Sequence, residues 1–261
     1  EINVSHHVRL FLVISSFTIF GNYKVIPFLA SMALIITTYL FANKITNNRL
    51  AGVIAAIIIL QSNLFLSFST TATYTNFWIL FYVISLFLVI HKTWFLSPIA
   101  YVMSIFSKIF STVFFPVSIF FVLNAEISIR KKIILFLVVV TLISVGLWMD
   151  QGNSMEPWNW NGFLNGFVSF SYQMKYDVLI VVFLLPVITG LYFISKKNRY
   201  ANSVSIMISG ILISNPILLA VTTVTTMPYR SIVLVVFFAI GAAMILANQK
   251  EDVKQVSKKS S

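Results

Sequence analysis

Long apolar runs follow one another along this chain of 261 residues, and short polar segments that hold most of the charges separate them. Several runs contain few charges and approach the roughly 17 to 25 residues with which a helix spans a bilayer. The pattern therefore predicts spanning helices at 25–42, 50–69, 77–91, 133–149, 178–195, 203–225 and 231–247. Membrane strands are not expected, because no segment alternates polar with apolar residues and lipid forbids open sheet edges.

Two further apolar segments do not fit a simple span. The run 8–20 is short and is followed by Gly21-Asn22, so it predicts an interfacial helix. The stretch 95–124 contains Lys108, a lone charge that is costly to bury in hydrocarbon. With 59% hydrophobic residues and a mean hydropathy of +0.93, the chain is expected to be an integral membrane protein. Since its membrane segments must then be helices, the fold is expected to be all-α. We predict a polytopic integral membrane bundle with about 8 to 10 membrane segments.

The basic residues indicate which loops lie in the cytoplasm. Because basic loops stay on the cytoplasmic side, five basic groups belong on one face of the membrane. They are Lys44 and Arg49; His91 and Lys92; Arg130, Lys131 and Lys132; Lys196, Lys197 and Arg199; and Lys250, Lys254, Lys258 and Lys259. The intervening loops at 70–76, 150–177 and 226–230 are neutral, net acidic or nearly bare of charge, as expected outside.

This alternation constrains the path of the stretch 95–124. A single span would place the 130–132 group outside, whereas two short helices that enter and leave on one face keep it in the cytoplasm. We therefore predict a short helical hairpin at 95–124, with its turn near Ser107-Lys108. The Lys108 ammonium would then reach the outer water interface instead of lying unpaired in lipid.

Composition sets limits on the domains and the location. Membrane segments and short loops use nearly the whole chain, so we predict one transmembrane domain, 1–248, and a disordered basic cytoplasmic tail, 249–261. The net charge of +11 follows from the basic loops and the tail, and no basic stripe indicates nucleic-acid binding. We expect an integral protein of the cell membrane with a cytoplasmic C-terminus.

The cations that remain after the cytoplasmic groups are set aside all fall at or near the outer face. They are Arg9, Lys24, Lys108, Lys175 and Arg230. Their convergence suits an anionic lipid head group, because charge-assisted hydrogen bonds hold a phosphate at the edge of a low-dielectric cavity. Arg230 is the best candidate, since the turn Met227-Pro228-Tyr229 fixes its height and a guanidinium binds two phosphate oxygens. The alternative is that these side chains snorkel to lipid head groups.

Histidines and tryptophans near the outer face offer further contacts. His6 and His7 are adjacent and cannot easily share one metal ion, so they either hydrogen-bond a polar substrate or have no role. Trp158 and Trp160 either stack on a sugar or belong to the aromatic belt of the membrane. The chain has no cysteine, zinc signature, phosphate-cradling glycine loop or nucleophile elbow, so we expect neither metal nor cofactor.

Four short segments, spread over nearly the whole chain, share their order and character with one group of membrane enzymes. They are a juxtamembrane helix at 8–21, a short basic turn at 43–52, a helical pair with a lysine at its tip at 104–116, and the aromatic-arginine turn Met227-Pro228-Tyr229-Arg230. This pattern resembles the membrane glycosyltransferases of the C-type fold. Members of that family take a sugar from a polyprenyl-phosphate donor on the outer face of the membrane.

The resemblance implies glycosyl transfer, with membrane lipid and a polyprenyl-phosphate sugar as partners and with Lys108 and Arg230 contacting the donor phosphate. In that family an acidic residue of the first outer loop acts as the base, and here that loop would precede Glu1. Unless Glu1 itself serves, we expect the C-terminal part of a longer protein, or an incomplete or inactive relative. The rival hypothesis is a non-enzymatic passive transporter or structural subunit. Its polar lining would include Asn215, Thr222, Thr223, Thr225 and Thr226.

Overall fold

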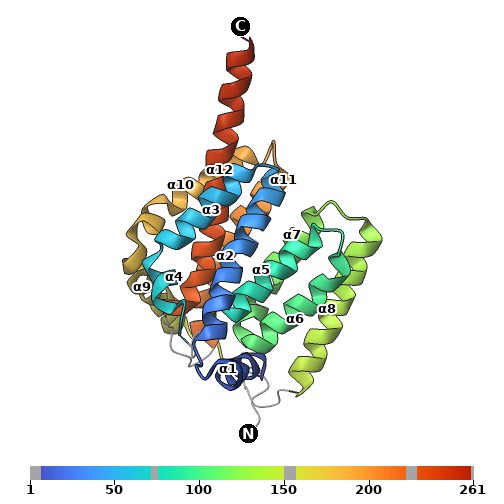
Figure 1. Ribbon diagram of the computed structural model, residues 1–261, viewed down its shortest axis with the longest axis vertical. Coiled ribbons are helices and arrows are strands. Elements are labelled where there is room, and N and C mark those ends of the chain that lie inside the picture. The colour runs from blue at the N-terminus through green and yellow to red at the C-terminus, as the bar shows by residue number, and fades with distance from the viewer. Residues whose placement is uncertain (1–6, 72–75, 150–156, 222–227, 260–261) are drawn as a thin grey trace.

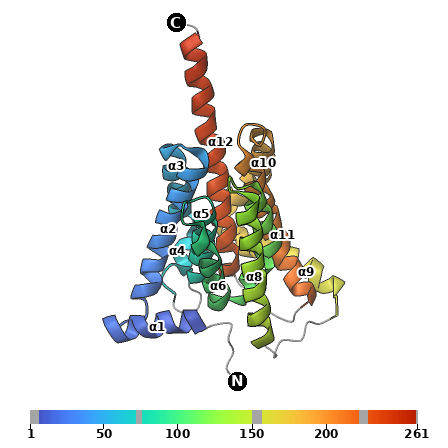
Figure 2. The same ribbon diagram turned by 90° about the vertical axis from the view of Figure 1, so that its right-hand side faces the viewer.

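The computed structural model describes residues 7–71, 76–149, 157–221 and 228–259, and these residues contain helices, turns and loops but no strand. The all-α prediction is therefore confirmed for the part of the chain that the structure describes. The helices form an elongated bundle, and helix α12 (Ile232–Lys259) runs through its middle and protrudes at one end (Figure 1). Helix α1 (His7–Phe20) lies across the opposite end, which we call the α1 end (Figure 2).

The other helices follow one another in chain order. They are α2 (Val25–Thr46), α3 (Arg49–Gln61), α4 (Asn63–Phe68), α5 (Phe77–Val89), α6 (Ser97–Ser107), α7 (Phe115–Asn124), α8 (Ile129–Met149), α9 (Trp160–Met174), α10 (Val178–Ile194) and α11 (Arg199–Val221). Short 3-10 turns lie between some of them: η2 (Trp94–Leu96), η3 (Ile109–Phe114), η4 (Lys175–Asp177) and η5 (Pro228–Ser231).

Several helices suit a membrane by length and composition. Val25–Thr46, Arg199–Val221 and Tyr229–Ala247 are long and apolar enough to cross one. Helix α10 is shorter, but its outward side chains Leu179, Leu185 and Phe193 are each at least 70% exposed, and a large apolar face of this kind indicates contact with lipid. The chain is therefore a membrane-associated protein. The count of about 8 to 10 membrane segments, the cell membrane and the cytoplasmic C-terminus stay predictions.

The helix predicted at 8–20 is present as α1, and a buried serine fixes its corner with α2. The Ser16 hydroxyl donates to the carbonyl of Asn22 at 2.6 Å and accepts from the amide of Ile26 at 3.1 Å. Between α1 and α2, Gly21 has a φ of 66°, a left-handed conformation that glycine adopts without steric cost. The breaker Gly21-Asn22 therefore turns the chain from the end of the bundle into its first long helix.

The single helix predicted at 50–69 is wrong, because the chain breaks at Ser62 into α3 and α4. Ser62 has an extended backbone with a ψ of 116°, and the carboxylate of Asp177 lies against the break. Asp177 accepts from the Ser62 hydroxyl at 2.6 Å and from the amides of Asn63 at 2.9 Å and Leu64 at 3.4 Å. These amides belong to the first turn of α4 and have no partner within that helix, so the carboxylate stabilises a second helix start here.

The stretch 95–124 forms the predicted hairpin, since α6 runs toward the α1 end and α7 returns (Figure 1). Both ends of the hairpin lie at the same end of the bundle. The Lys131 ammonium is 5.4 Å from the centroid of the Trp94 ring, and the Lys132 ammonium donates to the carbonyl of Leu123. Lys108 lies between α6 and η3, at the turn that the sequence predicted.

The segment 232–244 of α12 is apolar on all sides and is buried. Side chains that point in different directions around it, including Val235, Val236 and Phe237, are all 0% exposed. A helix without a polar face is stable only inside a larger protein or in lipid. Beyond the predicted domain boundary at 248, α12 continues as a helix to Lys259, where the sequence predicts a disordered tail. The Lys, Gln and Glu residues there favour helix, and no Gly or Pro interrupts it.

Helices α9 and α11 approach closely through two glycines of α9. A Cβ added to Gly162 would lie 2.3 Å from the carbonyl oxygen of Leu219, and one added to Gly166 would lie 2.4 Å from the Cα of Pro216. The glycine side of α9 therefore packs on the backbone of α11 near Pro216. The neighbouring residues Leu164 and Phe167 remain 60% and 44% exposed.

Candidate functional site

The turn of the hairpin holds Lys108 in a fixed position at the α1 end. Its amide donates to the carbonyl of Ser104 at 3.0 Å, which ends α6. Its own carbonyl accepts from the hydroxyl of Ser111 at 2.8 Å, and the Tyr101 hydroxyl donates to the carbonyl of Ser111 at 3.1 Å. Hydrogen bonds from both sides therefore fix the backbone from which the Lys108 side chain extends.

Tyr229 lies in η5, directly before α12, and its ring lies against the Lys108 ammonium. The nitrogen is 3.7 Å from the ring centroid, the geometry of a close cation–π contact. The edge of the Phe68 ring packs on Tyr229 with 6.2 Å between centroids. The hairpin, α4 and the start of α12 therefore meet at one aromatic residue. Lys108 is only 9% exposed, so the expectation that its ammonium reaches the water interface is wrong.

Arg230 is buried beside this contact with part of its hydrogen-bonding capacity unused. It is 7% exposed, and its guanidinium carbon lies 5.4 Å from the centroid of the Phe110 ring. The buried Nε and Nη1 atoms have no hydrogen-bond partner among the described residues. Buried donors without a partner are rare in native proteins, and a charged one is costly. The two donors are therefore available to a binding partner beyond the described residues, such as a bound anion.

Like charges converge on Lys108. Lys108 lies in a turn outside the spanning helices, and burial lowers the pKa of its ammonium below 10.5, with further lowering by the nearby charges of Arg230 and Arg9. No carboxylate among the described residues forms an ion pair with Lys108 or Arg230. The carboxylate of Asp177 is bound to the start of α4, and Glu126 pairs with Arg199 at 3.3 Å. The lowered pKa reflects the close approach of the basic groups Lys108, Arg230 and Arg9, and an anionic ligand beside them would favour the charged form of Lys108.

Three other predicted residues, Lys24, Lys175 and His7, are exposed at the surface. Lys24 lies 5.8 Å from the ring of its neighbour Tyr23, and Lys175 is exposed in η4. His7 is exposed at the start of α1, and His6 lies outside the described residues.

Trp158 and Trp160 form an aromatic cluster of their own. Their ring centroids are 5.4 Å apart, and both rings contact Phe163. The amide of Asn159 between them donates to the carbonyl of Ala220 at 2.8 Å, which ties the cluster to the end of α11. The rings are 45% and 68% exposed. This arrangement fits both alternatives that the sequence left open, the aromatic belt and a stacking surface for sugar.

Asp177 is the one buried acid among the residues whose side chains the structure describes, and the sequence did not single it out. Its 7% exposure and its three hydrogen bonds to the break at Ser62 give it a structural role. The polar pair Ser62-Asn63 inside an otherwise apolar run was the signal that could have revealed the break. The partner of that break, 114 residues away from Asn63, had no signal of its own.

The polar lining proposed for a transporter falls largely outside the part of the chain that the structure describes. Thr222, Thr223, Thr225 and Thr226 belong to the segment 222–227, and the side chain of Asn215 is likewise not described. Two cavities lie elsewhere: one of about 700 Å³ bounded by α3, α10 and α12, and one of about 230 Å³ bounded by α5 to α8. Neither is lined by Lys108, Tyr229 or Arg230.

Comparison with models of protein families, with curated proteins and with solved structures found no match to this chain. The description of the site therefore rests on the geometry alone.

Proposed function

We propose that this membrane protein binds the phosphate of a polyprenyl-phosphate sugar through Lys108 and Arg230 and takes part in glycosyl transfer at the α1 end. The observation that carries the proposal is the buried guanidinium of Arg230, whose Nε and Nη1 donors have no partner among the described residues. A phosphate offers acceptor oxygens and negative charge to both cations at once.

Glycosyl transfer gives these cations a chemical role beyond binding. When the bond between the sugar and the phosphate oxygen breaks, negative charge develops on the departing polyprenyl phosphate. Two cations held in a site of low water content stabilise that charge more in the transition state than in the bound donor. Lys108 and Arg230 would therefore assist the departure of the lipid phosphate as well as position the donor.

A lipid-linked phosphate fits better than a soluble one. The cluster lies at one end of a bundle whose outward helix faces are apolar, as on α10, so a ligand that reaches it from the bilayer keeps its chain in lipid. No described carboxylate is placed to deprotonate an acceptor, because Asp177 and Glu126 are engaged elsewhere. The resemblance assigns that step to a general base in the first outer loop.

The test compares donor binding and sugar transfer in three variants of the complete protein. Lys108→Gln and Arg230→Gln each remove charge-assisted hydrogen bonds, so each should weaken donor affinity by about 10- to 100-fold and lower turnover with it. Lys24→Gln, a cation at the same end outside the cluster, should leave both unchanged. Unaltered donor binding in both cluster variants would reject the phosphate role. Donor binding without any glycosyl product from the complete protein would instead favour the non-enzymatic rival.

A further inference from the structure

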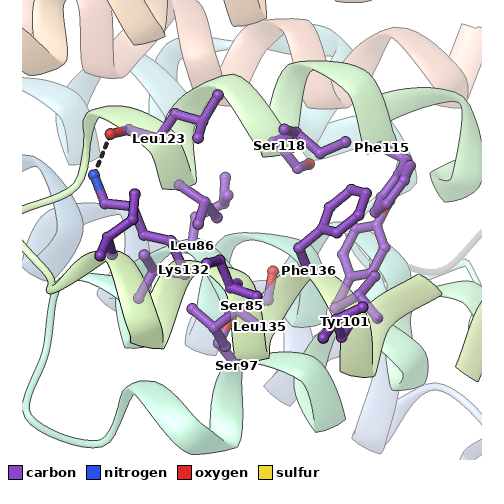
Figure 3. Close-up of a pocket in the computed structure, with 17 residues that line it drawn as sticks. Ser85, Leu86, Ser97, Tyr101, Phe115, Ser118, Leu123, Lys132, Leu135 and Phe136 are labelled. Carbon is purple, nitrogen blue, oxygen red and sulfur yellow. Dashed lines mark hydrogen bonds between the residues drawn. The ribbon is translucent and has the colours of Figure 1, made fainter. Parts of the chain in front are cut away.

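The smaller cavity, of about 230 Å³, lies between the hairpin and α8 (Figure 3). Neither Lys108 nor Arg230 lines it. Helices α5, α6, α7 and α8 each contribute to its wall, mainly with aliphatic and aromatic side chains. On α8, the lining residues Ile133, Phe136 and Leu137 are between 45% and 56% exposed, so this wall also faces the surroundings of the bundle. A ligand can therefore enter sideways from lipid.

The two ends of this cavity differ in polarity. At one end, Lys132 lines the cavity and donates to the carbonyl of Leu123, as Figure 3 shows. The neighbouring Arg130 and Lys131 are exposed there, so the mouth is basic. At the other end, the rings of Phe115 and Phe136 stack with 6.2 Å between centroids. The cavity is therefore amphipathic along its length, with cations at the mouth and aromatic rings at the far end.

A serine hydroxyl provides a second polar group on the wall. Ser97 lines the cavity at the start of α6 and is 7% exposed. Ser85 also lines the wall, but its hydroxyl already donates to the carbonyl of Tyr82 at 2.7 Å. A serine hydroxyl on the cavity wall can donate a hydrogen bond to an ester or phosphate oxygen of a ligand.

We propose that this cavity binds one acyl chain of an anionic phospholipid, with the lipid phosphate at Lys132. An ammonium has three donors and Lys132 gives one to Leu123, so two remain for phosphate oxygens. The adjacent Arg130 and Lys131 complement the negative charge of the head group. The apolar walls accommodate the chain and exclude a polar ligand such as a nucleotide, which would lose its hydration there without replacement.

The bound lipid would also stabilise the folded protein. Helix α8 borders the hairpin across this cavity, and an acyl chain between them replaces missing side-chain contacts with dispersion contacts. A ligand that binds only the folded chain raises the temperature of unfolding. We therefore expect phosphatidylglycerol to stabilise the protein more than phosphatidylcholine, which has the same chains and no net charge.

The experiment measures phosphatidylglycerol bound to the purified full chain in neutral detergent by native mass spectrometry. Lys132→Ala should weaken binding by about fivefold, the effect of one lysine near an anionic lipid. Lys196→Ala removes an exposed lysine from another loop at the same end and should change binding little. Val122→Trp fills the cavity and should abolish retention of the lipid. Val138→Trp, on α8 but outside the lining, is its matched control.

Cross-linking identifies where the lipid lies. Phosphatidylglycerol with a photoactivatable group on one acyl chain should label residues of the segments 115–123 and 133–139 in the unaltered chain, and this labelling should disappear in Val122→Trp. Equal binding by Lys132→Ala and Lys196→Ala, together with unchanged labelling in Val122→Trp, would overturn the proposal. Retention of palmitate but not of phosphatidylglycerol would overturn the assignment to a phospholipid. Helix content by circular dichroism establishes that each variant is folded.

Discussion

Replacement of Arg230 by methionine tests whether this residue lowers the stability of the ligand-free protein and is needed for anion binding. Methionine keeps an unbranched apolar stem, and it removes the charge and both unpaired donors, Nε and Nη1. Each buried donor without a partner costs about 1–3 kcal/mol, so the two together cost about 2–6 kcal/mol. Loss of the contact between the guanidinium and the Phe110 ring offsets about 1 kcal/mol of this.

The balance favours methionine in the absence of ligand. Replacement of buried ionic groups by apolar ones is known to stabilise proteins by about 1–4 kcal/mol, so we expect Arg230→Met to raise the free energy of unfolding by about 2 kcal/mol. Affinity for a lipid phosphate should fall by at least about 100-fold at the same time, since two charge-assisted hydrogen bonds are lost. A more stable protein that no longer binds is the signature of a residue retained for its ligand.

The assay is denaturant unfolding in one detergent, with and without farnesyl phosphate, for the unaltered chain and for Arg230→Met. Arg199→Met is a suitable control, because Arg199 is exposed and pairs with Glu126 at 3.3 Å. It should leave ligand affinity unchanged and shift stability by less than about 1 kcal/mol. Lower stability of Arg230→Met without ligand, together with unchanged affinity for farnesyl phosphate, would refute the reasoning and make Arg230 a packing residue.

Three further predictions concern the turn, the break and the hairpin. Because burial lowers the pKa of Lys108, the unfolded chain binds more protons between that lowered pKa and 10.5, so stability without ligand should rise with pH over this range. A titration of unfolding midpoints checks this, and Lys108→Met should abolish the slope. Asp177→Ala leaves three donors at the start of α4 unpaired and should lower the free energy of unfolding by about 2–4 kcal/mol, whereas an unchanged midpoint would contradict the capping role. Since the chain has no cysteine, single cysteines at 91 and 131 can be labelled from one side of reconstituted vesicles; both should react from the same side.

The path of the hairpin could be predicted from the sequence because charge and hydropathy constrain it together. The group at 130–132 requires both ends of 95–124 to lie on one side, and the lone charge of Lys108 requires a turn. The structure places Trp94 beside Lys131 and Lys108 at the turn, in agreement with both requirements. Local periodicity alone would have given a single long helix.

The details of the site depended on contacts between distant segments, which a single sequence does not reveal. Lys108 follows α6 and Tyr229 lies in η5, so only tertiary packing brings the ammonium over the ring. The break at Ser62 depends on Asp177, which lies far along the chain, so the apolar run 50–69 by itself predicts one helix. The sequence does not reveal the burial of Lys108 for the same reason, because Tyr229 of η5 lies against its side chain.

The central claim is that Lys108 and Arg230 form a site for a lipid phosphate, and binding calorimetry with a matched ligand pair tests it most directly. Farnesyl phosphate and farnesol have the same chain and differ only in the phosphate. The account predicts that the full chain binds farnesyl phosphate more tightly by at least about 100-fold, and that the double variant Lys108→Met, Arg230→Met loses this preference. Equal affinity of the unaltered chain for the two ligands would contradict the account.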